Sequence, residues 1–157
     1  MTTNLGIPSE SLKTSISQLE LALANEVVLY TKTRKFHWNV VGNSFMELHK
    51  LFENQYTELE EVIDAIAERI NTLGAKTIGT MTEFLGLTSL KEHPNVYPSQ
   101  SEMLTELLAD HETIIGVLRK DIKKSESLSD VGTTDFLTGL LQQHEKTAWI
   151  LRRYLTK

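Results

Sequence analysis

Several residues in the first half of the chain have the types and spacing of metal ligands. Four of them occupy one stretch, separated by four, eleven and four residues: His49, Glu53, Asp64 and Glu68. On an α-helix at about 100° per residue, these side chains fall within about 100° of one another, because eleven residues are close to three whole turns. Imidazole nitrogen and carboxylate oxygen together suit Fe(II), and also zinc or manganese. The spacing therefore indicates a metal site on one helix face.

A single copy of this helix cannot close the site. Glu53 and Asp64 would lie roughly 16 Å apart along the axis at about 1.5 Å per residue. Two antiparallel copies, related by a two-fold axis near residues 58 and 59, would place Glu53 opposite Asp64 and His49 opposite Glu68. This arrangement predicts two identical sites, each shared between two chains.

His37 is expected to supply a further imidazole, since it lies three heptads after Ile16 on the inward face of the preceding helix. The alternative is that these are ordinary surface charges with two histidines satisfied in the core, which is the commoner situation for any single residue. A centre built inside one bundle from Glu-x-x-His pairs is excluded, because the sequence contains no such pair. The other three histidines have no partner at ligand spacing and are expected to be surface or core histidines: His93, His111 and His144.

Composition restricts the class of protein further. The chain has 157 residues, 40% of them hydrophobic, so we expect one domain over residues 1–157 with a core of its own. It has no cysteine, which excludes disulfides and thiolate zinc sites and fits a reducing compartment. Residues 1–8 have neither a basic start nor an apolar stretch, and no apolar run approaches membrane-spanning length. A cytoplasmic protein without membrane segments is the expectation.

Apolar periodicity predicts an all-α chain with four long helices. They are expected from Ser9 to about Trp38, from Ser44 to Gly74, from Ser99 to near Ser125, and from about Phe136 almost to the C-terminus. The second and third begin with the Ser-x-x-Glu pattern of a capping box, and Gly74 is a plausible stop.

The connection over residues 75 to 98 contains two glycines and two prolines, with a short helical piece possible at 81–85. A connection of this length lets the second and third helices run parallel. The sequence therefore predicts a ferritin-like four-helix bundle with a short extra helix in its long crossover.

A series of motifs runs through the ligand region and on to the last helix. They are Lys35-Phe36-His37-Trp38-Asn39-Val40-Val41-Gly42, Phe45, Leu48-His49, Phe52-Glu53, Tyr56, Asp64-x-x-Ala67-Glu68-Arg69, Phe84-Leu85 and His144-Glu145-Lys146-x-x-Trp149. This pattern closely resembles the Dps family, the ferritin-like miniferritins of bacteria and archaea, over almost the whole chain.

The resemblance implies a dodecameric shell of tetrahedral symmetry that oxidises Fe(II), preferably with hydrogen peroxide and otherwise with dioxygen. Ferric mineral would be stored inside, which protects the cell and its DNA from oxidative damage. The resemblance also implies a pair of irons at each intersubunit site, with His37, His49 and Glu53 from one subunit and Asp64 and Glu68 from its neighbour. Glu53 departs from the family pattern, in which aspartate is common, so its carboxylate reaches one methylene further.

Four other residues gain roles from the resemblance. Trp38 matches a tryptophan thought to intercept oxidising equivalents, as an electron donor or radical trap, and an aromatic packed at a helix end is the alternative. Asp135 matches an acidic residue that lines the three-fold pore through which iron enters. Glu126 and Asp130 lie in the preceding loop, where negative potential would draw cations inward, and an ordinary solvated loop is the alternative for both.

DNA compaction is the second functional hypothesis, because some members of this family bind DNA through lysine-rich N-terminal arms. Here the first twelve residues contain no Lys or Arg, and the formal net charge is -5. The C-terminus offers only Arg152, Arg153 and Lys157. Release of counterions from DNA would therefore contribute little, and we expect a homo-oligomer that does not bind DNA.

Overall fold

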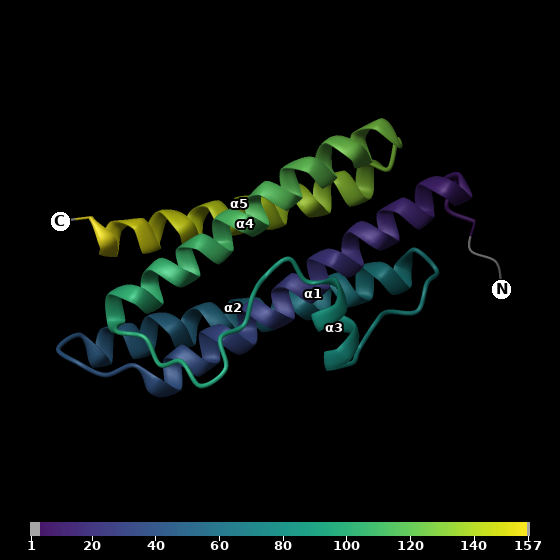
Figure 1. Ribbon diagram of the computed structural model, residues 1–157. Helices are drawn as coiled ribbons and strands as arrows, with labels where there is room; N and C mark the ends of the chain where they lie inside the picture. The colour runs from purple at the N-terminus through teal and green to yellow at the C-terminus, as the bar shows by residue number, and fades with distance from the viewer. Residues whose placement is uncertain (1–3, 157) are drawn as a thin grey trace.

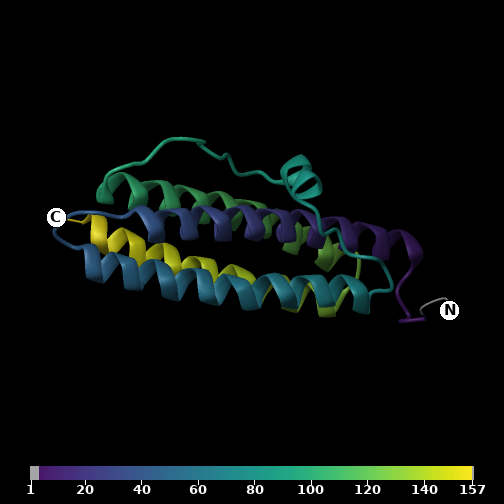
Figure 2. The same ribbon diagram turned by 90° about the horizontal axis from the view of Figure 1, so that it is seen from below.

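The computed structural model describes residues 4–156, and every regular element in this part of the chain is a helix. The elements are α1 (Ser9–Asn39), α2 (Phe45–Thr72), α3 (Met81–Leu87), α4 (Gln100–Ser127) and α5 (Val131–Leu155). The four long helices form a bundle, and α3 lies outside it against α1 (Figures 1 and 2). Helices α2 and α4 run in the same direction, because the crossover returns the chain along the bundle (Figure 1). The predicted all-α bundle with its short crossover helix is confirmed.

That residues 1–157 form one domain stays a prediction. Met1–Thr3 and Lys157 lie outside the described residues.

One of the two predicted capping boxes is present in the structure. Ser99 accepts a hydrogen bond from the Glu102 backbone N–H, and the Glu102 carboxylate accepts one from the Ser99 N–H at 2.8 Å. Thr80 caps α3 in the same way, which the sequence analysis did not foresee. The predicted box at Ser44 is wrong, because its side chain makes no capping hydrogen bond. The Glu47 carboxylate, which would have completed that box, instead accepts a hydrogen bond from the Tyr154 hydroxyl at 2.9 Å.

Gly74 ends α2 as predicted, two residues after the last helical residue, Thr72. Its φ of 90° is left-handed, where a side chain would be strained. The Gly74 N–H binds the Asn71 carbonyl and the Ala75 N–H binds the Ile70 carbonyl. This pair of hydrogen bonds is the Schellman ending of a helix.

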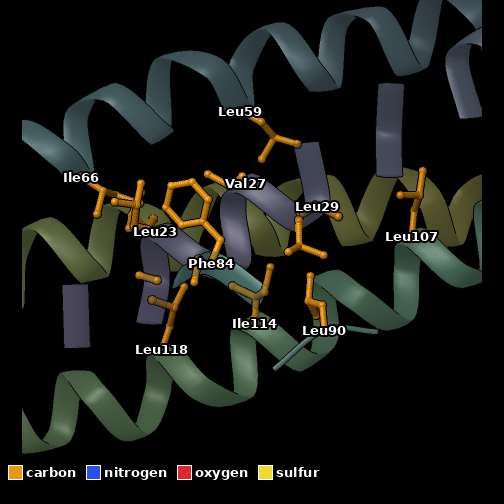
Figure 3. Packing of buried hydrophobic residues seen from close by; sticks show 14 of the residues in the cluster. Leu23, Val27, Leu29, Leu59, Ile66, Phe84, Leu90, Leu107, Ile114 and Leu118 are labelled. Carbon is orange, nitrogen blue, oxygen red and sulfur yellow. The ribbon is translucent and has the colours of Figure 1, made fainter. Parts of the chain in front are cut away.

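The core is continuous along the bundle and reaches the crossover. Leucine, isoleucine and valine side chains from the four long helices belong to one cluster. Figure 3 shows part of it, with labelled side chains from α1, α2 and α4. Phe84 of α3, which is 8% exposed, joins the same cluster beside Leu23 and Val27 of α1. The short helix is thereby attached to α1 by burial of one aromatic ring.

Buried polar contacts join the α1–α2 pair of helices to the α4–α5 pair. Lys32 of α1 is 7% exposed, and its ammonium lies 3.0 Å from the Glu106 carboxylate and 2.7 Å from that of Asp110 in α4. Nearer the other end of the bundle, Ser125 donates to Gln18 at 2.8 Å. Buried charges of opposite sign that also form hydrogen bonds are tolerated in a core, and they restrict how two helix pairs can dock.

We predict that Leu107→Ala lowers the free energy of unfolding by about 2–5 kcal/mol, because Leu107 is fully buried and its truncation leaves a cavity. Urea-induced loss of helical circular dichroism at one fixed protein concentration measures the change. Thr105→Ala on the exposed side of the same helix is the control, expected to stay within about 0.5 kcal/mol. Equal unfolding midpoints for the two variants would contradict this account of the core.

Candidate metal centre

His37 and His49 face each other where α1 ends and α2 begins. The turn at residues 40–44 reverses the chain, so the last turn of α1 lies beside the second turn of α2. The His37 Nδ1 lies 2.8 Å from the His49 carbonyl oxygen, and the His49 Nδ1 lies 2.9 Å from the His37 carbonyl oxygen. The two rings stack with centroids 3.7 Å apart and planes 21° from parallel. Each histidine therefore fixes the other.

Two more aromatic rings complete the support of this pair. The Phe45 ring lies 5.1 Å from that of His49, and the Tyr56 ring meets His37 edge to face at 5.2 Å. The imidazoles thus lie between a ring from the first turn of α2 and one from its third turn. Packing on both sides restricts ring rotation, as a preorganised ligand pair requires.

The reciprocal hydrogen bonds also decide which nitrogen can bind a metal. A carbonyl oxygen can only accept, so Nδ1 must carry the proton in both rings. A neutral imidazole protonated at Nδ1 has its lone pair on Nε2. Metal-binding histidines commonly donate their second ring N–H to a carbonyl or carboxylate in this way. Both rings are therefore prepared to ligate through Nε2.

Glu53 lies one turn after His49 and is half-buried. Its carboxylate receives a hydrogen bond from the Lys50 ammonium at 2.6 Å, and this contact, with the nearby imidazoles of His37 and His49, lowers the pKa of Glu53. An ionised carboxylate is the form that binds a cation. Lys50 competes for the same carboxylate, so an incoming metal must displace it from Glu53.

Asp64 and Glu68 project from the exposed surface of α2 one helical turn apart. Because α2 is unbroken from Phe45 to Thr72, Glu53 and Asp64 remain roughly 16 Å apart along its axis. Within residues 4–156, no three histidine or acidic side chains lie close enough together to hold a metal ion. One subunit therefore carries the candidate ligands in two separate groups, one with two imidazoles and one with carboxylates alone.

Trp38 is 64% exposed and does not pack into the end of its helix. The Arg34 guanidinium lies 5.1 Å from its ring and 4.8 Å from the Tyr56 ring, and it donates a hydrogen bond to the Tyr30 hydroxyl at 2.6 Å. Arg34 therefore joins three aromatic side chains beside the histidine pair.

The three acidic residues considered for the pore have different surroundings. Asp135 and Glu126 are exposed. Asp130 is 1% exposed and caps α5, accepting hydrogen bonds from the Ser15 hydroxyl at 2.6 Å and the Thr133 N–H at 3.1 Å. Burial alone would raise its pKa, but these hydrogen bonds and nearby Arg69 lower it below the usual value. The solvated-loop alternative is wrong for Asp130, and its carboxylate has no exposed face to offer a pore.

The structure brings together His37 and His49, as the sequence predicted, but the sequence did not reveal their neighbours. Lys50 was overlooked, although its place three residues before Glu53 is the spacing of a helical ion pair. The contacts of Tyr56 and Arg34 join α2 to α1, and periodicity within one helix says nothing about such pairs.

A model of the ferritin-like domain family matches residues 16–157. DNA protection during starvation protein 2 of Bacillus anthracis is 38% identical over 146 residues, which cover 92% of this chain and 99% of that protein. The chain belongs to the Dps family of ferritin-like proteins. A low-temperature-induced protein of Nostoc is similar to this Dps chain at 46% identity, over 97% of this chain and 86% of its own length.

Solved Dps structures have the same fold. DpsC from Streptomyces coelicolor superposes with a TM-score of 0.96 at 27% identity, covering 100% of this chain and 92% of that one. The Vibrio cholerae Dps protein, described as a member of a broad superfamily of ferritin-like diiron-carboxylate proteins, gives 0.92 at 30% identity, with 99% and 98% covered. In the described part of this Dps chain, no helix is both long and apolar enough to span a membrane.

We predict that Lys50→Gln increases the affinity of the metal-free protein for zinc by about two- to five-fold, because it removes the ammonium that competes for the Glu53 carboxylate. The increase is small because an exposed ion pair contributes little free energy. Isothermal titration calorimetry measures it. Lys13→Gln is the matched control, since Lys13 pairs with Glu10 at the same spacing outside the site. Tightening of equal size in both variants, or in neither, would show that Lys50 does not compete with the metal.

Proposed function

We propose that this Dps protein oxidises Fe(II) at centres shared between two subunits and stores the ferric product as mineral inside a dodecameric cytoplasmic shell. The observation that carries the proposal is the histidine pair whose Nδ1 atoms are both held by carbonyl oxygens, which leaves two Nε2 donors free to bind a metal, with Glu53 one turn further along α2. Asp64 and Glu68 lie too far along α2 to join them within one chain. An antiparallel second α2 would supply these carboxylates.

Each complete centre would offer two imidazoles and three carboxylates, with His37, His49 and Glu53 from one subunit and Asp64 and Glu68 from the other. This mixed nitrogen and oxygen set suits Fe(II), and it would accept zinc or manganese as substitutes. Iron is the substrate here. A pair of Fe(II) ions supplies the two electrons that convert one hydrogen peroxide into two hydroxide ions and leave two Fe(III), so no hydroxyl radical is released.

The protein's part in this reaction is to position donors and to control charge. The stacked rings of His37 and His49 hold their lone pairs in place before iron arrives, and Glu53 supplies negative charge once Lys50 has moved. Trp38 is proposed as an electron donor when only one iron is present, and it lies in the same aromatic group as Tyr56, which contacts His37.

Relatives named for DNA protection during starvation suggest the same role here. We attribute that protection to removal of iron and peroxide, because the net charge of -5 opposes direct binding to DNA.

The shared site predicts a specific rescue. A His37→Ala/His49→Ala chain and an Asp64→Ala/Glu68→Ala chain should each form shells that oxidise iron slowly with peroxide. When the two are unfolded and reassembled together, each mixed dimer regains one intact centre, because all its wild-type ligands then meet on one side. Random pairing restores about one quarter of the wild-type centres, and rapid ferric absorbance should recover to about that fraction. Reassembled single variants are the controls, and activity of the mixture no greater than theirs would show that the centre is not shared.

For the pore, we predict that Asp135→Asn slows the appearance of ferric absorbance without changing stability, since Asp135 is exposed. Asp130→Ala should lower stability without slowing oxidation. Loss of a helix cap costs about 1–2 kcal/mol, and the buried Asp130 carboxylate is not available to a pore. Stopped-flow oxidation and urea unfolding of both variants test the assignment. Slower oxidation in Asp130→Ala, with normal rates in Asp135→Asn, would reverse it.

A further inference from the structure

Three buried titratable side chains form a line through the bundle, away from the candidate metal centre. Glu26 of α1 is 0% exposed, and His144 of α5 and His111 of α4 are each 3% exposed. The His144 Nε2 lies 2.7 Å from a Glu26 carboxylate oxygen, and the His144 Nδ1 lies 2.8 Å from the His111 Nδ1. The sequence analysis left both histidines as surface or core residues, and the structure shows them as a connected chain.

The hydrogen bonds limit how many protons the side chains of Glu26, His144 and His111 can hold together. With Glu26 as a carboxylate, the His144 Nε2 must carry the proton between them. The two facing Nδ1 atoms can share only one proton, so when both rings are neutral, His111 donates to His144. This tautomer leaves the lone pair of His111 on Nε2. If both rings became imidazolium, two N–H groups would point at each other, and two like charges would lie in contact without water.

A small pocket gives a proton access to that lone pair. It lies between α2 and the α4–α5 pair, has a volume of about 20 Å³, and is lined by His111, His144, Gln55 and Glu58 among others. That volume is enough for about one water molecule. Gln55 is 7% exposed, and neither atom of its amide has a partner among residues 4–156. Its amide could hold a water molecule beside His111.

Few other charged side chains lie near Glu26, His144 and His111. Glu26 comes from α1, Glu58 from α2 and His144 from α5, and the remaining polar residues that line the pocket are neutral: Gln55, Gln143 and Thr147. Burial and the neighbouring His144 lower the pKa of His111 well below 6.5. The folded subunit therefore resists the second proton that an unfolded chain would accept.

We propose that the Glu26–His144–His111 chain is an acid-sensitive latch between the two helix pairs of the subunit. It opens when both histidines become protonated, with a proton entering through the pocket beside Gln55. The latch joins α1 to α5 and α5 to α4. Because the folded state binds fewer protons at His111 than the unfolded state does, its contribution to stability is complete above about pH 6.5 and is lost as the pH falls below that value. This inference does not depend on iron chemistry.

The test compares thermal unfolding of the metal-free full-length protein, with chelator present, between pH 7.5 and pH 5. His111→Asn places an amide near the position of Nδ1, where it can donate to His144 but cannot become charged. The fall in Tm on acidification should be about 3–8 °C smaller for His111→Asn than for wild type. His93→Asn removes a histidine whose side chain is 52% exposed and serves as the matched control, with a wild-type fall expected. An undiminished fall in His111→Asn would overturn the proposal.

Hydrogen–deuterium exchange of the wild-type protein keeps the proposal testable if His111→Asn does not assemble. After correction for intrinsic exchange, protection over residues 107–118 and 140–151 should decrease between pH 7.5 and pH 5.5 by more than protection over residues 12–19. An equal decrease in all three segments would show that acid loosens the subunit without opening this latch.

Discussion

The candidate centre depends on two crossed hydrogen bonds at the turn between α1 and α2. Each imidazole is held by the carbonyl oxygen of the other histidine, so the position of the turn and the orientation of the ligands are one constraint. Moving either helix by a residue would break both hydrogen bonds and separate the two stacked rings. The turn itself is anchored by Val40, which is 1% exposed, and by the left-handed Gly42. The site is therefore determined by backbone geometry as much as by its side chains.

Much of this arrangement could be predicted because it repeats along single helices. The bounds of the long helices follow closely from apolar periodicity, except that α5 begins at Val131 and not near Phe136. The shared face of His49, Glu53, Asp64 and Glu68 follows from helical pitch. The stop at Gly74 also follows from one residue type.

Contacts between helices could not be predicted in the same way, because they depend on how helices dock. Asp130 looked like an exposed loop acid, yet Ser15, which is 115 positions away in sequence, approaches its carboxylate and the start of α5 buries it. His111 and His144 are 33 residues apart and come from different helices, so no spacing rule relates them. Ser44 shows the converse, since the sequence there matches a capping box but the Ser44 side chain makes no capping hydrogen bond, and the Glu47 carboxylate binds the Tyr154 hydroxyl of α5.

Under the proposed function, the unbroken length of α2 also determines when a newly made subunit can begin to oxidise iron. Such a chain carries an imidazole-rich half-centre at one end and a carboxylate half-centre roughly 16 Å away, so it cannot gather a pair of irons while it is alone. Under the proposed function, iron oxidation begins only when a second subunit docks and supplies the missing ligands. Subunits that fold but do not assemble then cannot oxidise iron at these residues, so they need no separate inhibitor.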